Sequence, residues 1–219
     1  YLSINTVVGD DLDPKLYVAF QILEYVLLDA PGAPLKKALL DAGIGDDIMG
    51  GYEYGILQPY FSVIAKNAER EQKDEFVKVV KSTLRKLVDG GIELWSSEQG
   101  GRLIKNSEAD YGSAPKGLMY GLQCLDSWLY GGDPMMHLEY EETFAALKEG
   151  ADHGYFEGLI RTYLLDNPYE AVVIASPKKN LTARIEEQTA KKLKEYKDSL
   201  SKEEIDALVR QTKELKEYQ

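Results

Sequence analysis

The stretch PKLYVAFQILEYVLL, residues 14–28, is the strongest indicator of the fold of this chain. Its apolar side chains recur at the spacing of one face of an α-helix, and that face comprises Leu16, Ala19, Phe20, Leu23, Val26 and Leu27. Asp13 is a typical N-cap and Pro14 suits the first helical position, so the helix is expected to begin there. The apolar face is wide enough to predict that this helix is well buried.

The segments around this helix alternate between strand and helix patterns. Before it, residues 2–8 alternate in polarity and predict a strand that ends at Gly9. After it, the pattern predicts a short helix from Pro34 to Gly43, a β-hairpin over 46–68, a helix from Phe76 to Gly90, helices that open at Pro115 and at Asp133-Pro134, a helix over 153–165, and a last strand over 170–175. The fold class is therefore α+β, with an antiparallel or mixed sheet of about four to six strands covered by helices.

The composition changes at Leu181, where long charged residues alternate with sparse apolar positions. Ser201 and Glu204 form a capping box, with Leu200 and Ile205 placed as its hydrophobic staple. We expect two antiparallel helices joined near residues 198–201. The predicted domains are an α+β domain over 1–178 and a charged helical hairpin over 179–219.

Composition excludes several classes of function. The apolar runs are too short to cross a membrane, and the net charge of −11 argues against binding to nucleic acid. Cys124 is the only cysteine, so no disulfide can form within the chain, and we expect a reducing, intracellular site in the cytoplasm of a bacterium. Because the chain opens with Tyr1 in a strand-like run, we expect a piece of a longer polypeptide.

Gln21, Glu24 and Tyr25 in the buried helix have the spacing of the inverted zinc motif H-x-x-E-H. In that motif the two histidines bind the metal and the glutamate acts as general base. Here Gln and Tyr replace both histidines, and the whole chain contains only two histidines. Since a catalytic zinc needs about three protein ligands of His, Glu, Asp or Cys type, we predict no metal, no cofactor and no catalysis in this chain.

Three further features have a structural and a functional reading. Glu24 is either a stranded base with a raised pKa or a group that faces solvent or bonds a polar neighbour. Tyr52, Tyr54 and Tyr60 either line a peptide-binding wall or pack between sheet and helices. His137 has no ligand partner at a suitable spacing, so we expect it on the surface of a helix.

Several strings are together similar to the pitrilysin and insulin-degrading-enzyme family, and most closely to its presequence-protease and falcilysin subgroup. They are INTVVGD (4–10), APGAPLKKALLDAGIG (30–45), SAPKGLMYGLQ (113–123), DSWLYGGDP (126–134) and KKLKEYKDSLSKEEIDALV (191–209). The resemblance extends over the chain except for residues 92–107, where the Gly100-Gly101 pair interrupts a regular helix.

The resemblance implies a role without chemistry. Enzymes of this subgroup have four related domains in two halves, which close around a chamber that degrades unfolded peptides. This chain resembles the second domain and the start of the hairpin that links the halves. Gln21, Glu24 and Tyr25 then stand at the places of ligand, base and ligand, and Leu40 and Asp46 stand where the fourth domain supplies an Arg and a Tyr to hold substrate.

The function expected from the resemblance is that of a non-catalytic domain of a zinc metalloendopeptidase, with zinc held by the catalytic domain. Its partners would be the other peptidase domains and unfolded peptides, basic ones being favoured by the negative charge. No nucleic acid or membrane partner is expected. Two alternatives stay open: a separate inactive subunit that pairs with a catalytic chain, and an independent enzyme with an unrecognised site.

Overall fold

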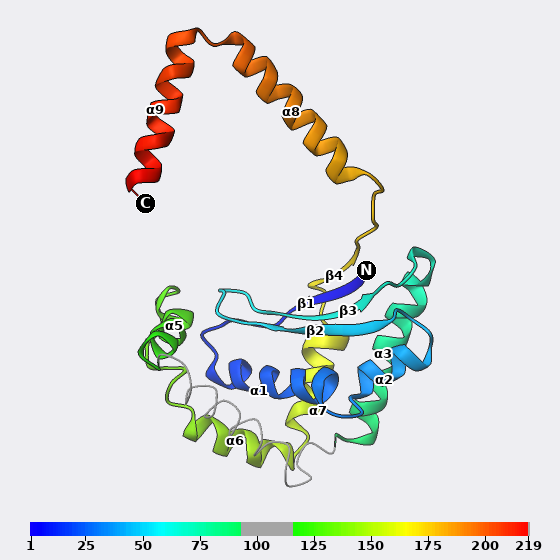
Figure 1. Cartoon of the computed structure of the whole chain (residues 1–219). Coiled ribbons are helices and arrows are strands. Elements are labelled where there is room, and N and C mark those ends of the chain that lie inside the picture. The colour runs from blue at the N-terminus through cyan, green and yellow to red at the C-terminus, as the bar shows by residue number, and fades with distance from the viewer. Residues whose placement is uncertain (93–115, 219) are drawn as a thin grey trace. The chain divides into compact units, whose positions relative to one another are not determined.

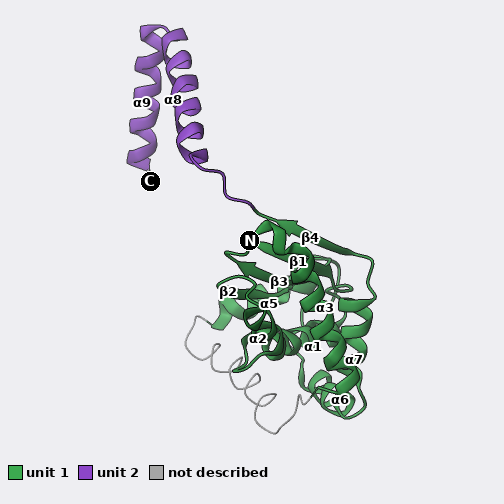
Figure 2. Cartoon of the chain, turned by 90° about the vertical axis from the view of Figure 1, so that its right-hand side faces the viewer, with its two compact units in different colours: residues 1–175 green, residues 176–219 purple. Residues whose placement is uncertain are grey.

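The computed structural model describes residues 1–92 and 116–218. The chain divides into two compact units, residues 1–175 and residues 176–219 (Figure 2). The expectations for residues 92–109, including the departure from the family pattern at 92–107, lie almost entirely outside the described residues, and so does Pro115.

Unit 1 is built on a four-stranded antiparallel sheet. Its strands are β1 (Leu2–Val7), β2 (Asp47–Glu53), β3 (Tyr60–Lys66) and β4 (Glu170–Ile174), in the order β2-β3-β1-β4. The predicted first strand, the hairpin and the last strand are all present, which confirms the α+β class. The first and last strands of the unit lie side by side, so residues about 170 positions apart close the sheet.

The helices of unit 1 pack on one side of this sheet (Figure 1). In chain order they are α1 (Pro14–Glu24), the π-helix η1 (Tyr25–Asp29), α2 (Pro34–Asp41), the 3-10 turn η2 (Arg70–Gln72), α3 (Lys73–Gly90), α5 (Lys116–Trp128), α6 (Glu141–Ala151), α7 (Tyr155–Leu159) and the π-helix η3 (Ile160–Leu165). The sheet and its helical layer enclose one hydrophobic core.

Helix α1 begins where its capping residues predict. The Asp13 carboxylate accepts hydrogen bonds from the backbone N–H groups of Lys15 (2.9 Å) and Leu16 (3.1 Å). Phe20, at the centre of the helix, is fully buried, and its ring lies 6.1 Å from the ring of Phe61 on β3. The helix is therefore held against the sheet by its apolar face, as the sequence predicts.

The region after Asp133-Pro134 differs from the predicted helix. Residues 134–138 form turns, and α6 begins only at Glu141. The Asp133 carboxylate accepts a hydrogen bond from the Met135 N–H (2.9 Å), a local turn that competes with helix formation.

Unit 2 consists of α8 (Leu181–Ser199) and α9 (Lys202–Tyr218). The predicted capping box is present at their joint: the Ser201 N–H donates to Glu204 Oε2 (2.8 Å), and the Glu204 N–H donates to Ser201 Oγ (3.2 Å). The two helices diverge from this joint and do not pack along their length (Figure 1), so apolar side chains such as Leu193 and Val209 stay exposed.

Candidate functional site: a metal-binding helix without its ligands

Gln21 occupies the first ligand position of the degenerate motif and is engaged with its own helix. Its side-chain amide Nε2 donates a hydrogen bond to the backbone carbonyl of Tyr17 at 3.0 Å. An amide held in this way satisfies a local polar group. It offers no imidazole nitrogen to a metal.

Glu24, at the general-base position, joins α1 to the sheet. Its Oε2 accepts a hydrogen bond from the Tyr52 N–H at 3.1 Å, and its Oε1 lies so near Gly51 that a Cβ at that residue would come within 2.8 Å. Burial raises the pKa of the Glu24 carboxyl, an effect that the Tyr52 N–H partly opposes. Both halves of the sequence alternative therefore hold: Glu24 bonds a polar neighbour and has a raised pKa.

Tyr25, at the second ligand position, is half-buried and is the first residue of η1. Its carbonyl accepts the N–H of Ala30 at 2.7 Å, the wider hydrogen-bond pattern of a π-helix. Across residues 1–92 and 116–218, no three His, Cys, Asp or Glu side chains are grouped closely enough to hold a metal ion.

Leu40 and Asp46 stand apart from this helix. Leu40 lies near the end of α2 with its side chain exposed, and Asp46 precedes β2. Asp46 Oδ2 accepts a hydrogen bond from Asn67 Nδ2 at 3.1 Å, which ties the two ends of the β2–β3 hairpin together. In this fold Asp46 thus has a local structural partner.

The three hairpin tyrosines do not form one cluster. Tyr52 is only 4% exposed and packs against Phe20, with the ring centroids 5.4 Å apart, so it has no surface to offer a peptide. Tyr60 projects to the opposite side of the sheet, because it lies one residue out of step with Phe61, the partner of Tyr52 in the register. Tyr54 is exposed but contacts the Tyr52 and Tyr17 rings. The wall role can apply only to Tyr54 and Tyr60.

A buried polar cluster lies beside α1, and sequence reasoning missed it. Tyr17 donates a hydrogen bond from its hydroxyl to Asp126 Oδ2 (3.0 Å), and the His137 ring stacks on the Tyr17 ring with centroids 3.8 Å apart. Asp11, fully buried, accepts from the Gly55 N–H at 3.3 Å. His137 is only 3% exposed, so the expectation of a helix-surface histidine is wrong.

The electrostatics of this cluster follow from burial. Desolvation raises the pKa of Asp11 to about 6 and raises that of Asp126, and it lowers the pKa of His137. Within the described part of the chain, Asp11 Oδ2 and both ring nitrogens of His137 make no hydrogen bond. The cluster ties α5 and the turns after it to α1. Its members are far apart in sequence and follow no recognisable spacing, so no motif could have revealed it.

Known proteins provide the comparison for this geometry. A family model described as peptidase M16 inactive domain matches residues 1–100, and one described as associated with subfamily C of the M16 peptidases matches residues 176–219. Protein HypA of Clostridium perfringens is 41% identical over the whole of this chain, which spans 23% of that protein. Presequence protease 1 of Arabidopsis thaliana is 29% identical over 98% of the chain and 21% of its own length.

Solved structures agree on the fold. The inactive peptidase domain of a candidate zinc protease from Bordetella parapertussis has a TM-score of 0.61 at 15% identity, covering 81% of this chain and 91% of that one. A protease from Helicobacter pylori has a TM-score of 0.56 at 17% identity over 80% of this chain and 41% of its own.

A helix with the spacing of a zinc-binding helix, packed on an antiparallel sheet but without either imidazole, defines an inactive domain of a zinc peptidase. The chain belongs to the M16 peptidase family, in which it comprises the inactive domain and the associated segment of subfamily C. The resemblance to presequence proteases is thus confirmed. The chain spans less than a quarter of the length of the two curated relatives named above. No helix among the described residues is both long and apolar enough to span a membrane.

Proposed function

We propose that this chain is the non-catalytic structural and chamber-wall domain of a zinc-dependent metalloendopeptidase that degrades unfolded oligopeptides. The supporting observation is the state of the motif on α1: Gln21 is bonded to Tyr17 and Glu24 to Tyr52. Positions that bind metal in a catalytic domain here stabilise the packing of helix on sheet. The zinc and its chemistry belong to another domain of the parent enzyme.

The experiment is elemental analysis of residues 1–219 after incubation with zinc and dialysis, together with a peptidase assay. We expect less than one tightly held zinc per chain and no activity. The double variant Gln21→His, Tyr25→His rebuilds H-x-x-E-H and is the matched comparison. It should gain only weak zinc binding, because a third ligand is missing and Glu24 remains bonded to β2. Stoichiometric zinc in the unchanged chain would contradict the proposal.

We further propose that the chamber wall favours basic peptides, since the chain has a net charge of −11. The long-range attraction weakens as salt shortens the Debye length. Binding of a cationic and an anionic unfolded peptide of equal length is measured at low and high salt. The cationic peptide should bind more tightly at low salt, and equal affinities would count against the idea.

The proposal also assigns the domain to the same polypeptide as its catalytic partner, in the cytoplasm of a bacterium. Its support is that both curated relatives named above extend far beyond the matched segment. Sequencing the natural reading frame tests it. An H-x-x-E-H motif in the same frame supports a fused domain, and one in a separate chain supports the alternative of a paired inactive subunit.

A further inference from the structure

The sheet of unit 1 has one side packed against helices and one open side (Figure 1). On the inner side, Glu170 of β4 pairs with Lys81 of α3, and Val172 and Ile174 pack on the core. Since neighbouring residues of a strand face opposite sides, Ala171 and Val173 of β4 face the open side. Both of these residues are exposed, with Val173 at 49%.

The register arranges the residues of the open side in three rows across the strands. The first row is Met49, Ile64, Ser3 and Val173, the second is Gly51, Ser62, Asn5 and Ala171, and the third is Glu53, Tyr60 and Val7. The second row contains only small or short side chains, and the rows beside it contain the larger ones. The open side is therefore a shallow trough between two ridges.

This side lacks the polar character of a solvated sheet face. An antiparallel sheet with one face in water normally alternates apolar inside and polar outside. Here β4 has apolar residues on both sides, and Met49 and Val173 are 42% and 49% exposed. In the three rows the only ionisable carboxylate is Glu53, at the edge of the sheet. Such a surface is suited to burial against an apolar partner.

The dimensions of the trough fit an α-helix. Its two ridges are four residues apart along each strand, about 13 Å at roughly 3.3 Å per residue. An α-helix with its side chains is about 10–12 Å in diameter. The small residues of the middle row, Gly51 and Ala171 among them, let a helix backbone approach closely. An identical trough on a second copy would face this one across a gap, because neither middle row fills the other.

We propose that an α-helix with an apolar face, from the polypeptide outside residues 1–219, lies across the strands over Gly51, Ser62, Asn5 and Ala171 and covers the open side. The proposal rests on the proposed function for the source of the helix, the remainder of the parent peptidase. In HypA the matched segment is 23% of the protein, so more than three quarters of that chain lies outside it. An unfolded peptide is not the expected occupant, since it would leave the trough part-filled.

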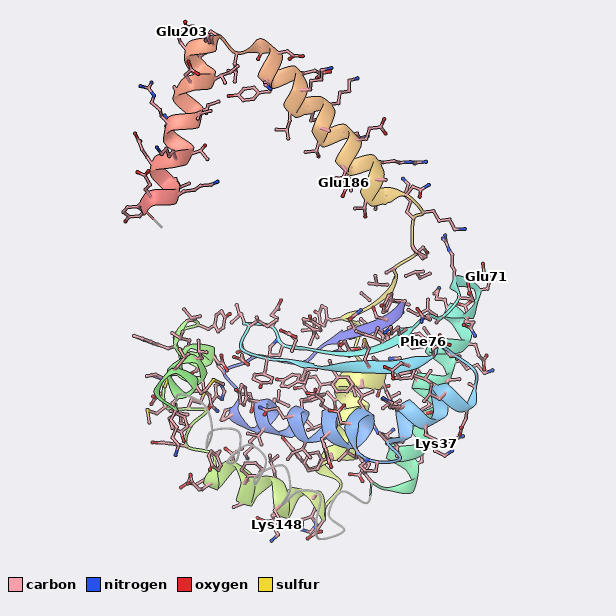
Figure 3. All side chains as sticks on the ribbon, viewed as in Figure 1. Lys37, Glu71, Phe76, Lys148, Glu186 and Glu203 are labelled. Atoms are coloured by element: carbon pink, nitrogen blue, oxygen red, sulfur yellow. The ribbon has the colours of Figure 1, made fainter. Side chains whose placement is uncertain are left out.

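The test is photo-cross-linking in cells that express the natural full-length polypeptide. A benzoylphenylalanine replaces Tyr60 on one ridge or Met49 on the other, and a third variant has it at Lys148, on the side of α6 away from the sheet (Figure 3). Mass spectrometry should find cross-links from positions 60 and 49 to one segment outside 1–219, at sites three or four residues apart. Position 148 should give no cross-link to that segment.

A matched pair of substitutions tests the trough itself. Ala171→Trp fills the middle row, whereas Ala145→Trp changes an exposed alanine of α6. The first should reduce the cross-link yield at least about tenfold because overfilling costs roughly 1–3 kcal/mol, and the second should leave the yield unchanged. Cross-links to a second copy, to added peptide alone, or to nothing would overturn the inference.

The same experiment separates this inference from the proposed function. A helix captured from a protein without H-x-x-E-H would overturn the function and leave the docking intact. An active peptidase whose ridge positions give no cross-link would overturn the docking alone.

Discussion

Glu24 is the residue at which the history of a catalytic fold and the needs of packing meet. Its pKa is raised by burial, so the folded state favours the protonated carboxyl more than the unfolded state does. This contribution to stability is present below the ordinary value of 4.5 and is lost as the pH rises through the folded pKa. Glu24→Gln keeps an acceptor for the Tyr52 N–H without a buried charge.

We therefore expect Glu24→Gln to equal or exceed the unchanged chain in stability at pH 7, by up to about 1 kcal/mol, and to lose this advantage near pH 4. Glu24→Ala leaves the Tyr52 N–H without its acceptor and should cost about 1–3 kcal/mol at both pH values. Urea denaturation at the two pH values measures these differences. A Gln variant as unstable as the Ala variant would show that the charge itself is required.

His137 predicts a pH dependence of opposite sign. Its pKa is lowered by burial, so the unfolded chain binds the proton more readily, and stability falls as the pH drops below about 6.5. Asp11, whose pKa is raised to about 6, contributes in the other direction and adds stability over the same acid range. The two effects partly cancel in the unchanged chain.

His137→Phe keeps an aromatic ring on Tyr17 and removes only the acid-side loss. Its stability relative to the unchanged chain should rise by about 1 kcal/mol between pH 7 and pH 5. The exposed His153 is the matched control, and His153→Phe should give a pH-independent difference. Parallel stability curves for the His137 variant and the unchanged chain would refute the assignment.

Helix α1 is the element on which the fold depends. Phe20 is fully buried and contacts rings from two strands and from η3, namely Tyr52, Phe61 and Tyr163. Phe20→Ala should destabilise unit 1 by about 3–5 kcal/mol, through lost burial and the cavity left behind. Thermal or urea unfolding measures it.

The comparison for that prediction is Leu40→Ala on α2, where the side chain is 39% exposed. We expect a change of only about 0.5 kcal/mol there, since surface substitutions away from the core have small effects. Equal losses at the two positions would mean that α1 is not the organising element of the core.

At the scale of the whole molecule, the predicted domain 1–178 remains to be tested as an independent folding unit. All described residues of the hydrophobic core precede residue 175. A truncated chain of residues 1–178 should therefore unfold cooperatively, with a midpoint within a few degrees of that of the full chain. Circular dichroism should show lost helical signal from residues 181–218 only. Aggregation or non-cooperative melting would show that residues 179–219 are needed for folding.

Local pattern was enough to establish most elements. The Asp13-Pro14 cap, the apolar face around Phe20 and the Ser201–Glu204 capping box act within a few residues, so their outcome could be predicted from the sequence. The absent imidazoles at Gln21 and Tyr25 are likewise a matter of residue identity. Asp133-Pro134 misled because the same two residues suit a turn and a helix start, and neighbouring packing selects between them.

Long-range packing was needed for the rest. Asp11, Asp126 and His137 meet only because α5 and the following turns fold back on α1, across more than 100 residues of chain. Tyr52 and Tyr60 differ in fate because strand register, not composition, assigns each side chain to a face of the sheet. Which face stays open depends on where the helices pack, and that placement is a property of the assembled core rather than of any one segment.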